Sequence, residues 1–133
     1  MSLFDFFKLK NTVGRGYLSI YDQQTVADKW QQVEELLGGN SAEAKRRAVI
    51  EADKVLDYVL DRLFPNQAST GERLKLAKEI FVGRIQEYDE LWFAHKARNE
   101  MVHNLNFEMP TAEVNATLEK FKEGLKILGG LRP

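Results

Sequence analysis

The chain has 133 residues, enough for one domain with a single hydrophobic core, and its 44% hydrophobic and 29% charged residues are typical of a folded globular protein. Its net charge of −1 argues against a protein that coats nucleic acid through overall basicity, but it is compatible with a local basic patch. The lack of cysteine excludes disulfides, thiolate metal sites and cysteine nucleophiles and fits a cytoplasmic protein, and no apolar run approaches the roughly 18–20 residues of a transmembrane helix.

The first 16 residues form a segment of their own, rich in aromatic and basic side chains, ahead of a single helical domain over 17–133. Residues 1–10, MSLFDFFKLK, lack the order of a signal peptide, in which basic residues precede a longer apolar stretch and a cleavage site. We expect this piece to pack on its own domain or on a second subunit. The alternatives are docking on a partner and weak peripheral contact with a membrane surface.

Helical periodicity then fills the chain. Apolar residues recur at helical spacing over 25–37, and two glycines stop that run. Ser41 is a typical N-cap for a long helix over 42–64, which ends before Pro65. The apolar stripe of this long helix is the clearest core face of the sequence and comprises Ala48, Val49, Ala52, Val55, Leu56, Val59, Leu60 and Leu63.

Three further helices are predicted. Thr70 is expected to cap a helix over 70–81, and the next helix is expected over 88–103. The last helix opens at Pro110-Thr111 and ends at two glycines. Its apolar stripe consists of Val114, Leu118, Phe121, Leu125 and Leu128. Because the sequence shows neither alternating β patterns nor internal repeats, it predicts an all-α, up-and-down bundle of about five helices with short connections.

Both histidines of the chain lie in one short stretch, AHKARNEMVHN (94–104), within a predicted helix. His95, Asn99 and His103 recur at every fourth position and form a stripe at the edge of the apolar face. Arg98 lies about 140° around the helix from His103, so the two could meet only where the helix ends or distorts, or across a symmetric dimer. The histidines are about 12 Å apart, too far to share one metal ion, so neither metal nor cofactor is expected.

These residue types suit one kind of chemistry. A histidine near its ordinary pKa can accept and donate protons at neutral pH, and an arginine offers a planar charged fork that fits phosphate oxygens. An asparagine can orient either group without adding charge. Together they indicate phosphodiester cleavage without a metal, in which the ribose 2′-hydroxyl attacks and leaves a 2′,3′-cyclic phosphate and a 5′-hydroxyl end.

The segment RNEMVH (98–103) resembles the R-x4-H signature of the HEPN domain family, with a polar residue directly after the arginine, as that family prefers. The segments AVIEADKVLDYVLDRLF and LWFAHKARNEMVHNLNF resemble core helices of small bacterial HEPN proteins, and the likeness covers about residues 26–129. It implies a helical bundle that forms a homodimer and brings two motif copies into one cleft. It also implies a metal-independent ribonuclease, often a toxin or defence effector with an antitoxin or other protein partner, although some members are non-catalytic.

By this resemblance Arg98 and His103 are the catalytic pair and Asn99 supports them. Leu105 stands where the branch paired with a nucleotidyltransferase antitoxin carries a tyrosine, which puts modification by such a partner in doubt. His95 lies outside the signature. It is either a helper on the same helix face or, as we expect, a packing or surface residue.

Other candidates have both a functional and a structural interpretation. Asp53 could pair with Arg98 or tune His103, or it could simply solvate a helix edge. Four basic residues could contact RNA phosphates or form a solvated surface: Lys45, Arg46, Arg47 and Lys96. Three aromatic residues could stack on bases, although packing in the core or a dimer interface is favoured: Trp30, Trp92 and Phe93.

Three hypotheses follow. The first is a dimeric metal-independent endoribonuclease with a composite site of Arg98, Asn99 and His103 that cleaves RNA. The second is a non-catalytic HEPN-like module that binds a nucleotide, RNA or a protein through the same cleft. The third is a helical interaction protein that acts through its aromatic N-terminus. We favour the first.

Overall fold

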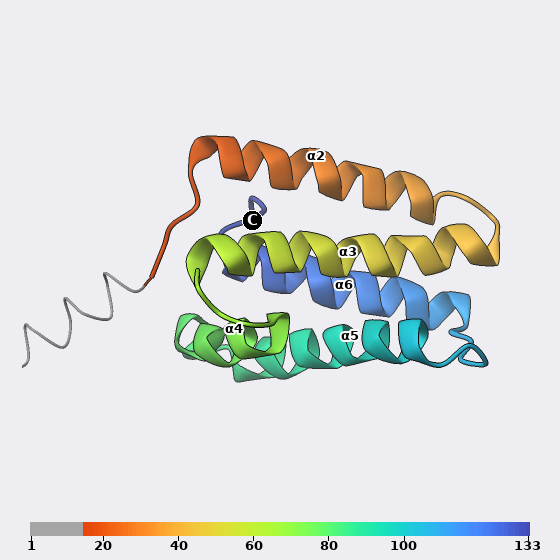
Figure 1. Ribbon diagram of the computed structural model, residues 1–133. Coiled ribbons are helices and arrows are strands. Elements are labelled where there is room, and N and C mark those ends of the chain that lie inside the picture. The colour runs from red at the N-terminus through yellow and green to blue at the C-terminus, as the bar shows by residue number, and fades with distance from the viewer. Residues whose placement is uncertain (1–14) are drawn as a thin grey trace, which may run out of the picture.

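The computed structural model describes residues 15–133, and this part of the chain is all helical, as predicted. Consecutive long helices run in opposite directions, which makes an up-and-down bundle (Figure 1). The elements in chain order are α2 (Ile20–Leu37), α3 (Ala42–Leu63), α4 (Thr70–Ala77), the 3-10 helix η1 (Lys78–Phe81), α5 (Ile85–His103) and α6 (Thr111–Ile127).

Helix α3 lies at the centre of the bundle because its apolar stripe is the broadest. It packs against α2, α4, α5 and α6, and all eight residues of the predicted stripe are buried. Ser41 caps it as predicted, with its hydroxyl accepting from the backbone N–H of Ala44 at 3.0 Å. Burial on several sides makes α3 the element that fixes the side chains of its neighbours.

Helix α2 begins at Ile20 rather than at Thr25. The cause is a capping box: the Ser19 hydroxyl accepts from the Asp22 backbone N–H, and the Asp22 carboxylate accepts from the Ser19 backbone N–H, both at 3.0 Å. The extra turn has little apolar periodicity, since Ile20 and Tyr21 are exposed, and so the hydrophobic pattern did not indicate it.

The predicted cap at Thr70 is wrong by one residue. Ser69 is the N-cap of α4, and its hydroxyl accepts from the backbone N–H of Glu72 at 3.2 Å. Thr70 is the first helical residue, and its hydroxyl donates to the Asp57 carboxylate of α3 at 2.6 Å. The predicted helix over 70–81 is also two elements, since η1 follows α4, and Gly83 then turns the chain with φ of +80°.

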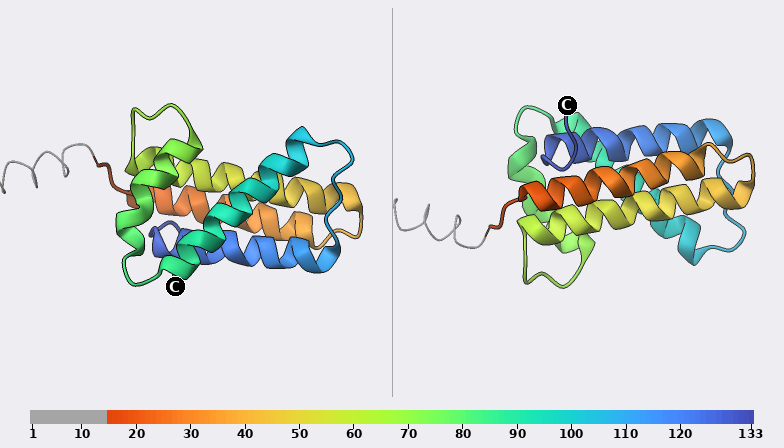
Figure 2. Two further views of the ribbon diagram at one scale, coloured as in Figure 1. Left: turned by 90° about the horizontal axis from the view of Figure 1, so that it is seen from below. Right: turned by 90° about the horizontal axis from the view of Figure 1, so that it is seen from above.

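Helix α5 begins at Ile85, earlier than predicted, and α6 begins at Thr111, as predicted. In Figure 2, α5 runs obliquely across the other long helices and contacts both α3 and α6. The contact with α6 is close at Gly124, where an added Cβ would lie 2.7 Å from Leu91 Cδ1. The crossing therefore places one side of α5 against the buried face of α3, where the candidate site lies.

Candidate functional site

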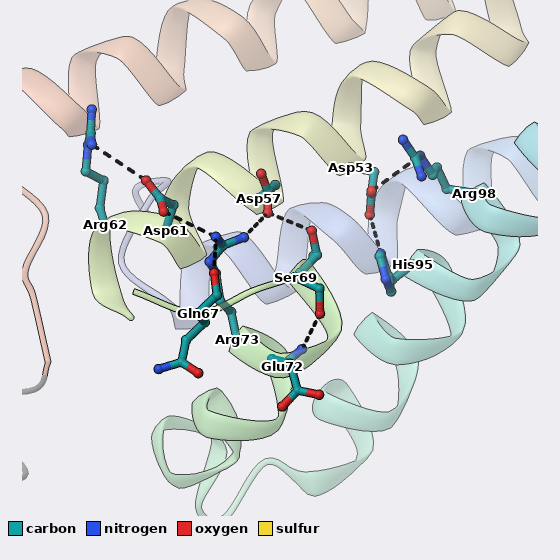
Figure 3. A network of polar contacts seen from close by, with 11 residues as sticks. Asp53, Asp57, Asp61, Arg62, Gln67, Ser69, Glu72, Arg73, His95 and Arg98 are labelled. Carbon is teal, nitrogen blue, oxygen red and sulfur yellow. Dashed lines mark hydrogen bonds and ion pairs between the residues drawn. The ribbon is translucent and has the colours of Figure 1, made fainter. Parts of the chain in front are cut away.

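A buried carboxylate lies at the contact of α3 and α5. Asp53 is 4% exposed, and each of its oxygens faces a side chain of α5 (Figure 3). Oδ1 lies 2.8 Å from His95 Nδ1, and Oδ2 lies 3.4 Å from Arg98 Nε. A buried ionised carboxylate is strongly destabilising unless it is paired. The contacts with His95 and Arg98 therefore give each oxygen of this buried carboxylate a polar partner in the interface.

The hydrogen bonds around His95 form a continuous chain. In the tautomer with the proton on Nδ1, His95 donates to Asp53, and its Nε2 accepts from the Asn99 amide nitrogen at 3.4 Å. The Asn99 amide oxygen in turn accepts from Arg98 Nη1 at 3.0 Å. With this tautomer every contact in the chain joins one donor to one acceptor, so His95 fixes the orientation of the Asn99 amide.

Arg98 contacts both Asp53 and Asn99 but remains partly accessible to solvent. Its side chain is 25% exposed. Its Nε is buried and forms no hydrogen bond of acceptable geometry, so its contact with Asp53 at 3.4 Å is an attraction between charges rather than a well-formed hydrogen bond. The guanidinium is thus anchored through Asp53 and Asn99, while part of its fork faces solvent.

His103 occupies a different environment from His95. It is exposed and is the last residue of α5, one helical turn beyond Asn99. Within residues 15–133 no hydrogen bond or ion pair joins it to Arg98 or to Asp53. The expected stripe of three polar residues therefore runs from buried His95 through half-buried Asn99 to exposed His103, and a single protomer does not bring the predicted catalytic pair into contact.

The four basic candidates are distributed over separate places. Lys45 donates to the Thr111 hydroxyl at 2.9 Å, and Lys45 and Arg46 border a hollow beside the end of α5. Arg47 borders another hollow, between α2 and α3. Lys96 lies over the Trp92 ring at 5.6 Å from its centroid. A contact with RNA phosphates remains a prediction for each of them, but they do not form one patch.

The three aromatic candidates also differ from one another. Trp30 is 5% exposed and belongs to the core, as the packing interpretation predicts. Trp92 is half-buried and meets the His95 ring edge to face at 6.1 Å. Phe93 is 58% exposed, with Lys120 of α6 over its ring at 4.3 Å. Two aromatic rings are therefore accessible on α5 of the single protomer.

Two polar clusters away from the motif were not predicted, and both have a structural role. The Asp22 carboxylate accepts from Tyr58 Oη at 2.9 Å and faces Arg62 Nε at 3.3 Å. The hydrogen bond from the Ser19 backbone, together with those from Tyr58 and the Ser19 side chain, lowers the pKa of Asp22 despite partial desolvation. These contacts tie the first turn of α2 to α3.

The second cluster is centred on Arg73 of α4. Its guanidinium contacts Asp57 at 2.8 Å and Asp61 at 3.4 Å and donates to the Gln67 carbonyl at 3.0 Å (Figure 3). Asp57, which also accepts from the Thr70 hydroxyl, binds the start of α4 to α3. The spacing of Asp57 and Asp61 on α3 is the only sequence signal for this cluster. Their partner Arg73 lies beyond the connecting loop, where helical spacing on α3 does not indicate it.

Comparison of the chain with protein-family models, with curated proteins and with solved structures finds no match. The HEPN resemblance therefore rests on the sequence segments alone and stays a prediction. Among residues 15–133 no helix has the length and apolarity to cross a bilayer. The proposed roles of residues 1–10, including membrane contact, concern a segment outside the described residues.

Proposed function

We propose that this protein is a metal-independent endoribonuclease of HEPN type, in which Arg98, Asn99 and His103 act on the scissile phosphate. One observation carries the proposal: a half-buried guanidinium is anchored by Asp53 and Asn99, five residues before an exposed imidazole without a partner among the described residues. This arrangement combines a fixed positive charge with a free acid–base group, which are the two requirements of phosphodiester cleavage without metal.

The proposed reaction is a transesterification. His103 accepts the proton of the ribose 2′-hydroxyl while the 2′-oxygen forms a bond to phosphorus. The bond from phosphorus to the 5′-oxygen breaks, and the leaving oxygen takes a proton from a second imidazole. Arg98 stabilises the negative charge that accumulates on the phosphorane oxygens. The products are a 2′,3′-cyclic phosphate and a 5′-hydroxyl end.

A homodimer supplies what one protomer lacks. Arg98 and His103 lie about 140° apart around α5, and a second imidazole is needed for the leaving group. A symmetric pairing of α5 helices meets both requirements, because His103 of the partner subunit then faces the phosphate that Arg98 contacts and supplies the second imidazole. In this arrangement Asp53 and His95 are positioning residues, which act on Arg98 and Asn99 rather than on RNA.

The proposal includes a cytoplasmic localisation and an inhibitory partner for the enzyme. The lack of cysteine fits a reducing cytoplasm, where RNA is available. An unregulated ribonuclease is harmful to its cell, so an antitoxin or another inhibitory partner is part of the proposal, as for toxins of this family.

The second candidate is a non-catalytic module that binds RNA, a nucleotide or a protein in the same place. The Asp53–Arg98 ion pair favours it, since a guanidinium whose charge is offset by a buried carboxylate stabilises a phosphorane less than a free one does. Such a site still binds a phosphate through the exposed part of the fork.

Cleavage of RNA in excess EDTA separates these candidates. Wild type is compared with His103→Ala and Arg98→Ala, with Arg84→Ala as the matched control, because Arg84 is an exposed arginine at the opposite end of α5. The proposal predicts cleavage by wild type and Arg84→Ala and loss of cleavage in the two motif variants, all with unchanged helicity and dimer mass. Absence of cleavage by folded wild-type dimer across varied single-stranded RNAs supports the binding module.

A further inference from the structure

One side of α5 carries four chemically distinct side chains in line. Trp92, Lys96, Asn99 and His103 follow the spacing i, i+4, i+7 and i+11, which places them within about 60° of one another around the helix. Two members belong to the proposed active site, and the other two are an aromatic ring and a cation. We call these four residues the α5 stripe.

Trp92 is a fixed ring at one end of this stripe. The His95 ring lies 6.1 Å from it, and a Cβ placed on Gly71 at the start of α4 would be 3.8 Å from Trp92 Cη2. Trp92 and Phe93 border a hollow of about 500 Å³, with Lys96 and Asp89 at its rim. Lys96 Nζ lies over the Trp92 ring at 5.6 Å from its centroid, so the lysine must swing aside for a base to stack there, which leaves its charge for a phosphate. The ring itself is packed on one edge and loses little conformational freedom when a planar ligand stacks on it.

We infer that the α5 stripe is a track for single-stranded RNA, in which a base stacks on Trp92, a phosphate contacts Lys96, and the scissile phosphate lies at His103. This inference rests on the proposed function, because it assigns the substrate class of the same site. The distance along the helix from Trp92 to His103 is about 16 Å, which corresponds to about three to five nucleotides of a stacked or extended strand.

The chemistry of the track selects a single strand. Stacking on an aromatic side chain needs an unpaired base whose face is open, whereas a duplex offers only base edges and backbone. The rim of the hollow carries one lysine and one aspartate, so its net attraction for phosphate is small. The affinity therefore comes from stacking more than from charge, and its dependence on salt should be shallow.

The experiment measures binding in the His103→Ala background, which keeps the RNA intact. The probe is a fluorescein-labelled single-stranded RNA of eight nucleotides, with the same sequence in a blunt duplex for comparison. Trp92→Leu tests the ring, and Trp92→Phe tests whether another aromatic ring rescues it. Tyr21→Leu is the matched control, since Tyr21 is a 76% exposed aromatic residue on α2, remote from α5.

The expected result is that Trp92→Leu weakens binding of the single strand about five-fold or more, while Trp92→Phe and Tyr21→Leu stay within about two-fold of the parent. Duplex binding should be weak and unaffected. Equal affinities of Trp92→Leu and Tyr21→Leu would overturn the track, and so would conversion of the dimer to monomer by Trp92→Leu, because the stripe would then be a subunit interface.

The outcome is independent of whether the protein cleaves RNA. If wild type does not cleave but the affinity depends on Trp92, the track is upheld and the ribonuclease proposal fails. If wild type cleaves and Trp92→Leu binds normally, the ribonuclease proposal is upheld and the track fails.

Discussion

Replacement of Asp53 by alanine tests whether the buried network constrains the fold. The change removes the acceptor of the His95 Nδ1–H and the counter-charge of Arg98. An unsatisfied buried donor costs about 1–3 kcal/mol. Removing one partner of a fully buried ion pair costs about 3–5 kcal/mol. Arg98 is 25% exposed and can turn toward water, so the loss of its counter-charge destabilises the fold by less than this. We expect a loss of about 2–3 kcal/mol in the free energy of unfolding.

Urea unfolding followed by far-UV circular dichroism measures this loss as a lower midpoint at unchanged slope. For a chain of this length, the same loss corresponds to a fall in Tm of about 6–12 °C. Glu51→Ala is the control, because its pair with Lys54 lies on the same helix but at the surface, and exposed pairs contribute about 1 kcal/mol or less.

A double-mutant cycle between Asp53→Ala and His95→Ala then isolates the pair. Since the two side chains are in contact at 2.8 Å, the combined loss should be smaller than the sum of the single losses by about 1 kcal/mol or more. Stability of Asp53→Ala within about 0.5 kcal/mol of wild type, or additive losses, would refute the view that this carboxylate holds the motif in place.

Three further outcomes are expected. Folding lowers the pKa of Asp22 from its ordinary value of 3.8, so the ionised carboxylate stabilises the fold above pH 3.8, and this stabilisation is lost as the pH falls through the folded pKa. Asp22→Asn should therefore flatten the acid side of a plot of unfolding free energy against pH, and an unchanged plot contradicts this. Gly124→Ala should lower stability by about 1–3 kcal/mol despite its better helix propensity, because the added Cβ would lie 2.7 Å from Leu91 Cδ1, and an unchanged or higher Tm argues against the close crossing. Asn99→Ala should lower the rate of RNA cleavage by about ten- to a hundred-fold with little change in Tm, since it frees the guanidinium, and an equal rate removes Asn99 from the site.

Much of the fold follows from patterns within single helices. The α3 stripe and the Ser41 cap were predicted correctly because a long run at one period and a capping serine are both local signals. The errors occurred where polar side chains decide the boundary. Ser69 and Thr70 are adjacent and both suited to cap a helix, and the first turn of α2 depends on the reciprocal bonds of Ser19 and Asp22 rather than on apolar spacing.

The candidate site was predictable in part for the same reason. The motif residues lie close together in the sequence, so their types and spacing indicated a chemistry. The contact that organises these residues could not be predicted from local spacing, because Asp53 and His95 lie on different helices and meet only through the crossing of α3 and α5. Among the alternatives for Asp53, pairing with Arg98 agrees with the structure, and the buried bond to His95 was not foreseen.

The most direct test of the ribonuclease proposal is cleavage of one defined single-stranded RNA beside the same RNA with a 2′-deoxy sugar on the 5′ side of the cleaved bond, in EDTA, with product ends identified by mass spectrometry. The proposal predicts a 2′,3′-cyclic phosphate and a 5′-hydroxyl from the all-ribose strand, no cleavage at the 2′-deoxy position, and no product with His103→Ala. Cleavage that persists at the 2′-deoxy position, or that His103→Ala retains, would contradict it.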